Sequence, residues 1–91
     1  MRQVVTSVIG LGYVGLPVAV SLGKFFRTIG FDIKEERIRE LLKGYDRTGE
    51  VTAADLKSPK LTITSQLDDL RQANFYIIAV PTPINSANQP D

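Results

Sequence analysis

The 91-residue sequence contains no cysteine, no histidine and no tryptophan. Without cysteine the chain has no disulfide, no thiolate metal site and no cysteine nucleophile. Without histidine it also lacks the most common general base and a common metal ligand. We therefore predict no metal site and no catalytic residue in these 91 residues. A demanding chemical step would need groups that this chain does not carry.

The sequence also has little excess of either charge and no long uninterrupted apolar run. Eleven basic and 10 acidic residues give a formal net charge of +1, so we expect neither nucleic acid nor a membrane surface as a partner. Residues 3–23 are uncharged and, with Arg2 before them, could be read as a signal peptide. Gly10, Gly12, Gly15 and Pro17 interrupt that stretch, which argues against a signal peptide and a membrane helix. We expect a cytoplasmic protein.

What the sequence does contain is a glycine pattern followed by an acid. Residues 8–15 read Val-Ile-Gly-Leu-Gly-Tyr-Val-Gly, and Asp32 ends the next apolar run. Gly10 suits a tight turn, Gly12 a close approach of the backbone to a pyrophosphate, and Gly15 close packing of a helix on a sheet. The helix N-terminus would offer its N–H groups to the phosphates. Asp32 would accept hydrogen bonds from ribose hydroxyls, so the pattern indicates a dinucleotide site.

Hydrophobic periodicity predicts alternating strands and helices along the chain. Strands are expected at 3–9, 28–32, 61–64 and 75–80. Helices are expected at 13–26, 34–43, 53–57 and 66–72. The core-facing side chains of these helices are expected to be Val14, Val18, Leu22 and Phe25 in the first, Ile38, Leu41 and Leu42 in the second, and Leu67 and Leu70 in the last. Gly44 is expected to end the second helix.

This alternation predicts an α/β fold, a parallel sheet with right-handed crossovers and helices on both faces. A dinucleotide-binding fold of the Rossmann type has the strand order 3-2-1-4 for its first four strands. Such a fold normally has six strands. We therefore expect residues 1–91 to be one cofactor-binding domain, truncated at its C-terminal side.

Each candidate residue also has a simpler interpretation. The three glycines could form only a strand-to-helix turn, which would explain one or two of them but not all three. Asp32 could be a helix N-cap, a role that can coexist with ribose binding. Arg37 is either a solvated helix residue or a guanidinium that reaches the adenosine ribose or the adenine face. Asp46 and Glu50 are expected to be loop charges.

The segment Pro81-Thr82-Pro83 follows the last predicted strand. Ligands of open α/β sheets bind at the carboxyl ends of the strands. The prolines alone would make a rigid strand terminator. The hydroxyl and N–H of Thr82 would face the crevice, so we predict that Thr82 contacts the cofactor.

Three phrases together resemble one family, the UDP-glucose/GDP-mannose (nucleotide-sugar 6-) dehydrogenases, in their N-terminal NAD-binding domain. They are Val-Ile-Gly-Leu-Gly-Tyr-Val-Gly-Leu-Pro at 8–17, Gly-Phe-Asp-Ile at 30–33 and Val-Pro-Thr-Pro at 80–83. The Asp-Arg-Thr-Gly-Glu-Val phrase at 46–51 is more similar to the bacterial branch acting on UDP-N-acetylhexosamines. Those enzymes supply precursors of surface polysaccharides.

The resemblance implies NAD as the cofactor and assigns a role to each matching position. The pyrophosphate loop comprises Gly10, Gly12, Tyr13, Val14 and Gly15. Asp32 and Arg37 lie at the adenosine ribose, and Thr82 contacts the cofactor near the sheet edge. The family oxidises the C6 hydroxyl of a UDP-sugar to a carboxylate in two NAD-dependent steps, through an enzyme-bound thiohemiacetal and thioester.

The nucleophilic cysteine of the family belongs to a later segment. The chain as given is therefore expected to hold NAD without oxidising a sugar, and the parent protein is expected to be a homo-oligomer. Two alternatives remain. One is a regulatory module that binds a dinucleotide without catalysis, and the other is a 3-hydroxyacid or 6-phosphogluconate type dehydrogenase. The Val-Pro-Thr-Pro phrase argues against the second.

Overall fold

The computed structural model describes residues 4–79 of the chain. Strands and helices follow one another as the sequence predicts, with each of the described helices shorter than expected. The elements are β1 (Val5–Ile9), α1 (Gly15–Leu22), β2 (Arg27–Phe31), α2 (Glu35–Leu42), α3 (Ala53–Leu56), β3 (Leu61–Thr64), the 3-10 helix η1 (Leu67–Gln72) and β4 (Phe75–Ile78).

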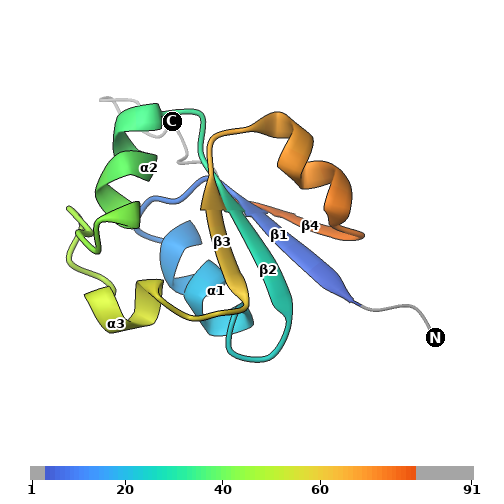
Figure 1. The fold of residues 1–91 in the computed structure, drawn as a ribbon, viewed down its shortest axis with the longest axis horizontal. Coiled ribbons are helices and arrows are strands. Elements are labelled where there is room, and N and C mark those ends of the chain that lie inside the picture. The colour runs from blue at the N-terminus through green and yellow to red at the C-terminus, as the bar shows by residue number, and fades with distance from the viewer. Residues whose placement is uncertain (1–3, 80–91) are drawn as a thin grey trace, which may run out of the picture.

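The four strands form one parallel sheet in the order β3-β2-β1-β4, which confirms the predicted order. In its register, Val8 of β1 lies beside Gly30 of β2 on one side and Ile77 of β4 on the other. Figure 1 shows α1, α2 and α3 on one face of the sheet, with η1 on the other. Because β1 and β2 are parallel neighbours, their carboxyl ends lie at the same edge of the sheet, beside α2.

Two hydrophobic clusters hold these layers together. The larger lies between the sheet and the three α-helices and comprises Val8, Leu11, Leu16, Ala19, Val20, Ile38, Leu41, Leu56, Leu61 and Ile63. The smaller lies under η1 and comprises Val5, Ile29, Phe31, Leu70 and Ala73. Because Leu11 belongs to the larger cluster and is fully buried, the turn after β1 is anchored by its own side chain.

The buried face of α1 differs from the predicted stripe. Val14 and Phe25 are mostly exposed, at 69% and 71%, because the helix begins at Gly15 and ends at Leu22. Both residues thus lie outside it. The residues that α1 buries against the sheet are Gly15, Leu16, Ala19 and Val20. Val18 and Leu22 pack only at the edge of this cluster.

Two further leucines predicted to face the core are exposed. In α2, Ile38 and Leu41 are buried, whereas Leu42 lies one residue further around the helix and faces solvent. In η1, Leu70 packs under the sheet and Leu67, the first residue of the helix, is exposed. Gly44 has a φ of 88°, which confirms it as the predicted helix stop.

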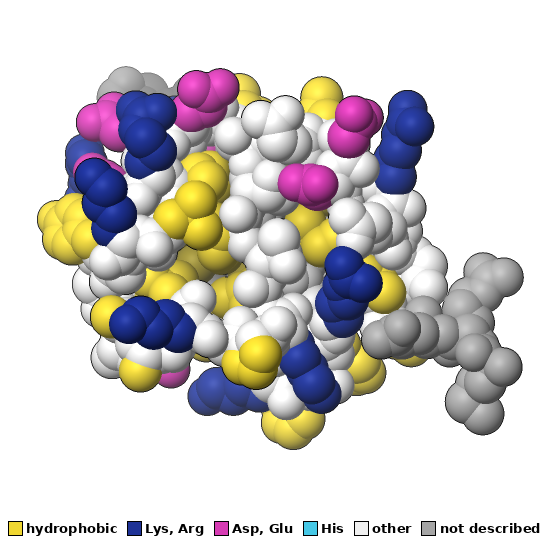
Figure 2. Space-filling view, viewed as in Figure 1, with side chains coloured by type: hydrophobic (Ala, Val, Ile, Leu, Met, Phe, Trp, Pro, Cys, Tyr) yellow, Lys and Arg dark blue, Asp and Glu magenta, His cyan; other side chains and the backbone are white. Residues whose placement is uncertain are grey.

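The surface mixes charges of both signs. In the view of Figure 2, Asp and Glu side chains lie mainly along the top, and Lys and Arg side chains lie beside them and along the lower edge. No helix within residues 4–79 is long and apolar enough to cross a membrane. Over the same range, no group of three or more His, Cys, Asp or Glu side chains is placed to hold a metal ion.

Candidate dinucleotide site

Two of the three motif glycines are required by the fold itself. Gly10 follows β1 with a φ of 102°, a conformation that L side chains rarely adopt. Its N–H donates to the Phe31 carbonyl at 2.8 Å, so the turn starts while still bound to β2. At Gly15 a Cβ would lie 1.7 Å from the Gly10 carbonyl oxygen. Gly10 therefore makes the turn, and Gly15 allows α1 to pack against it.

Gly12 is not required in this way. Its φ is not positive, and a Cβ at this position would meet no atom of the described residues within 4 Å. Gly12 lines the cleft beside the turn. A side chain there would occupy open space at the cleft, so the fold alone gives no reason for glycine. A ligand that approaches the backbone closely does give one.

The start of α1 has the features of an anion site. Within residues 4–79, no acceptor is found for the N–H groups of Gly12, Tyr13 and Val14. No side chain of the described part caps α1, and the first turn of the helix carries no acidic residue. Unpaired N–H groups and the positive end of the helix dipole together favour a negatively charged group such as a phosphate.

A cleft of about 740 Å³ extends from this turn to α2. That volume falls within the range of roughly 300–1,000 Å³ typical of small-molecule sites. Its walls come from the end of β1 and the glycine turn, the end of β2, α2 and the loop that follows α2. The lining residues are Ile9, Gly10, Leu11, Gly12, Phe31, Asp32, Ile33, Lys34, Glu35, Glu36, Arg37, Glu40, Arg47 and Thr48.

Asp32 connects the end of β2 to the glycine turn. Its Oδ2 accepts the Leu11 N–H at 3.0 Å, and its Oδ1 accepts the Lys34 N–H at 3.0 Å. It is not the N-cap of α2, because Lys34 occupies that position. A carboxylate offers about four acceptor positions. Two protein donors therefore leave room for ribose hydroxyls at the cleft.

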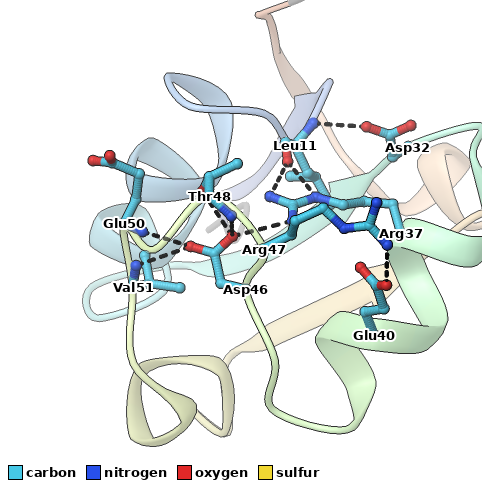
Figure 3. A network of polar contacts seen from close by, with 9 residues as sticks. All are labelled: Leu11, Asp32, Arg37, Glu40, Asp46, Arg47, Thr48, Glu50 and Val51. Atoms are coloured by element: carbon cyan, nitrogen blue, oxygen red, sulfur yellow. Dashed lines mark hydrogen bonds and ion pairs between the residues drawn. The ribbon is translucent and has the colours of Figure 1, made fainter.

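Arg37 is not the solvated helix residue of the simpler interpretation. Its Nε and one terminal nitrogen donate to the Leu11 carbonyl at 2.9 and 2.6 Å. The other terminal nitrogen lies 3.1 Å from Oδ1 of Asp46, and the Arg37 side chain is only 13% exposed. Figure 3 shows that the guanidinium lies between the glycine turn and the loop after α2. Contact of Arg37 with the cofactor stays a prediction.

Asp46 is a charge in the loop after α2, as expected, but its side chain is buried, which the sequence did not indicate. Burial raises the pKa of its carboxyl, but hydrogen bonds from Thr48, Val51 and Glu50 lower that pKa to about 2. Oδ1 accepts the N–H and hydroxyl of Thr48 at 3.0 and 2.7 Å. Oδ2 accepts the N–H groups of Glu50 and Val51 at 2.8 and 3.0 Å. The Asp46 carboxylate thus organises the 46–51 turn, while the Glu50 side chain is exposed as expected.

The structure brings most of the predicted site residues together at one cleft. Gly10, Gly12, Asp32 and Arg37 line it directly, while Tyr13, Val14 and Gly15 continue from it into α1. Thr82 lies outside the described residues. Sequence reasoning missed Asp46, although an aspartate two residues before a threonine in a loop is a common turn signal.

A family model described as "UDP-glucose/GDP-mannose dehydrogenase family, NAD binding domain" matches residues 4–91. The chain belongs to this family. Its cofactor is accordingly NAD, and the resemblance found in the sequence is confirmed.

Individual proteins that are similar to this chain support the family assignment. The chain is 58% identical over 85 residues to protein CapL of Staphylococcus aureus, covering 93% of this chain and 20% of that protein. It is 50% identical over 92 residues to the UDP-N-acetyl-D-glucosamine 6-dehydrogenase of Pseudomonas aeruginosa, covering all of this chain and 22% of that enzyme. The chain therefore spans about a fifth of the length of these relatives.

A solved structure of a UDP-D-ManNAc dehydrogenase from Pyrococcus horikoshii has the same fold. It matches with a TM-score of 0.80 at 32% identity, over 90% of this chain and 21% of that chain. The predicted Rossmann-type sheet is thus confirmed by both the strand order and this match.

Proposed function

We propose that residues 1–91 form the NAD-binding portion of a nucleotide-sugar 6-dehydrogenase that oxidises the C6 hydroxyl of a UDP-sugar to a carboxylate. The main support for the cofactor site comes from Gly12. The fold does not require glycine at this position, and Gly12 lies at the cleft beside unpaired N–H groups. Relatives named as UDP-N-acetylhexosamine dehydrogenases support the substrate class.

The described residues fit the parts of the cofactor. The N–H groups from Gly12 to Gly15 would bind the pyrophosphate, with Tyr13 and Val14 at the exposed rim of the turn. Asp32 would accept hydrogen bonds from the adenosine ribose, and Arg37 would border the same ribose. Thr82 is proposed to contact the cofactor from beyond β4. When bound, NAD supplies a hydride acceptor for the oxidation.

The finer parts of the proposal concern the whole protein. We propose that it acts in the cytoplasm as a homo-oligomer, takes neither nucleic acid nor membrane as a partner, and supplies a surface-polysaccharide precursor. Protein CapL, whose name suggests a capsule, is 58% identical over the matched region and supports that role. The family match favours this proposal over a regulatory module and over a 3-hydroxyacid type dehydrogenase.

NAD is expected to bind at least about tenfold more tightly than NADP, a difference of about 1.4 kcal/mol. The 2′-phosphate of NADP would lie beside the Asp32 carboxylate, and two unit charges about 4 Å apart repel by about 1 kcal/mol even in water. Arg37 is already bound to Leu11 and Asp46, and Arg47 is paired with Glu40. Titration calorimetry with both cofactors measures the ratio.

Asp32→Asn is the matched variant for this measurement, because it removes the charge and keeps one acceptor oxygen. The preference for NAD should shrink in this variant. Equal or tighter binding of NADP by the unaltered protein would show that Asp32 does not face the ribose.

Residues 1–91 alone are expected to give no turnover. Hydride transfer requires the substrate carbon held about 3–3.5 Å from its acceptor with a base beside it, and the second oxidation in this family requires a thiolate. The chain contains neither cysteine nor histidine. The purified chain is incubated with NAD and a panel of UDP-sugars, and the absorbance of reduced cofactor is followed.

The matched sample is a protein in which a later, cysteine-containing segment of the family follows residues 1–91. That sample should reduce two NAD per UDP-N-acetylhexosamine. Steady turnover by residues 1–91 alone would show that the catalytic groups lie within these residues and not in a later segment.

A further inference from the structure

Both main-chain polar groups of Leu11 are held by side chains from other elements. The Leu11 N–H donates to Asp32, and the Leu11 carbonyl accepts two hydrogen bonds from Arg37. The Leu11 side chain is fully buried in the main cluster. Leu11 stands between Gly10 and Gly12, so these contacts determine where the backbone of the glycine turn lies.

Arg37 in turn depends on Asp46 for its place. The Arg37 guanidinium is nearly buried, and its charge lies beside the Asp46 carboxylate, whose side chain is only 1% exposed. A buried guanidinium without a partner carboxylate is costly. Without Asp46, the long Arg37 side chain would lower its free energy by turning toward water, which would release the Leu11 carbonyl.

Asp46 is itself fixed by the turn that follows it. Its two oxygens accept four hydrogen bonds from Thr48, Glu50 and Val51. Figure 3 shows the resulting chain of contacts from this turn through Arg37 to Leu11. The same turn reaches the cleft, because Arg47 and Thr48 line it together with Gly12.

We infer that Asp46 is a positioning residue for the dinucleotide site, which acts by holding Arg37 on the Leu11 carbonyl and thereby sets the glycine turn in place. The inference rests on the proposed function, since it assigns a purpose to contacts behind the NAD cleft. Asp46 does not touch the cofactor space itself and is absent from the residues that line the cleft. The inferred route from Asp46 to NAD runs through Arg37 and not through Arg47 or Thr48, which also line the cleft, and the double variant below separates the two.

The test compares Asp46→Asn with Asp55→Asn. Asp55 is a suitable control because its carboxylate also accepts a backbone hydrogen bond, from the Thr52 N–H in the capping box of α3, and it makes no hydrogen bond or ion pair with Arg37 among the described residues. Both variants lose one negative charge. Calorimetry on folded samples should show NAD binding weakened by at least about tenfold in Asp46→Asn and by less than about twofold in Asp55→Asn.

Arg37→Gln gives the second arm of the experiment. If Asp46 acts through Arg37, adding Asp46→Asn to Arg37→Gln should change the NAD affinity by less than about twofold. Two contacts that merely stabilise the fold separately would give additive losses instead. Additive losses, or equal affinities in Asp46→Asn and Asp55→Asn, would overturn the inference.

Hydrogen exchange of the Leu11 amide, measured without NAD, separates this inference from the proposed function. Exchange at Leu11 should be at least about tenfold faster in Asp46→Asn than in Asp55→Asn. An unchanged Leu11 amide would overturn the positioning role whether or not NAD binds. Failure of the unaltered, folded protein to bind NAD would instead overturn the proposed function.

Discussion

Gly12→Val should weaken NAD binding by at least about a hundredfold, or about 2.8 kcal/mol, while leaving the fold intact. The added side chain meets no described atom within 4 Å of its Cβ, and the backbone at Gly12 is not in the positive-φ region. It does fill the space at the cleft that a pyrophosphate would need. Calorimetry gives the affinity, and circular dichroism with urea unfolding gives the state of the fold.

The opposite outcome is easily recognised. A Gly12→Val protein that binds NAD with unaltered affinity would show that the cofactor does not approach the backbone at this position. The proposed cofactor site would then be wrong, since Gly12 carries it.

In contrast to Gly12→Val, which leaves the fold intact, Gly15→Ala should cause a large loss of the free energy of unfolding. Its Cβ would lie 1.7 Å from the Gly10 carbonyl oxygen, and backbone atoms at that distance must move. Overpacking of this kind typically costs about 1–3 kcal/mol and occasionally more. Because the clash is with the backbone of the adjoining turn, we expect a loss of about 3 kcal/mol or more. Urea unfolding measures it directly.

Gly49→Ala is a useful companion to Gly15→Ala. Gly49 has a positive φ of 73°, but a Cβ there meets no described atom within 4 Å. Its loss of stability should therefore be smaller, reflecting backbone conformation alone. A Gly15→Ala protein as stable as the unaltered one would contradict the close packing of α1 on the turn.

The sequence predicts the architecture well because its signals are local and repeated. The strand Val5–Ile9 consists mostly of β-branched residues, and Gly44 ends α2 at the expected place. The glycine spacing then determines how the first strand and helix must join. The strand order follows from assigning the glycine pattern to a dinucleotide-binding fold, and the crossover rule adds the handedness of the connections.

Helix faces are predicted less accurately, because neighbouring residues lie about 100° apart around a helix and a stripe assigned one residue off therefore points in another direction. The close approach of Gly15 to the glycine turn determines where α1 begins. The spacing of apolar residues within the helix does not indicate this starting point. Leu16 and Ala19 are therefore buried where Val14 and Phe25 were expected.

The supporting contacts of the site were not predictable from residue types. Arg37 and Asp46 look like ordinary polar residues in a helix and a loop. Their pairing depends on the path of residues 43–51, which the fold as a whole determines. The ligand-facing positions were easier to find, because glycines and an acid at fixed spacing follow from the shape of the cofactor.

The most direct measurement is a crystal structure of the protein with NAD. The account predicts pyrophosphate oxygens within hydrogen-bond distance, roughly 2.7–3.2 Å, of the N–H groups between Gly12 and Gly15. It also predicts adenosine ribose hydroxyls that donate to the Asp32 carboxylate. NAD bound at another face of the sheet, or with its pyrophosphate away from the start of α1, would contradict the account.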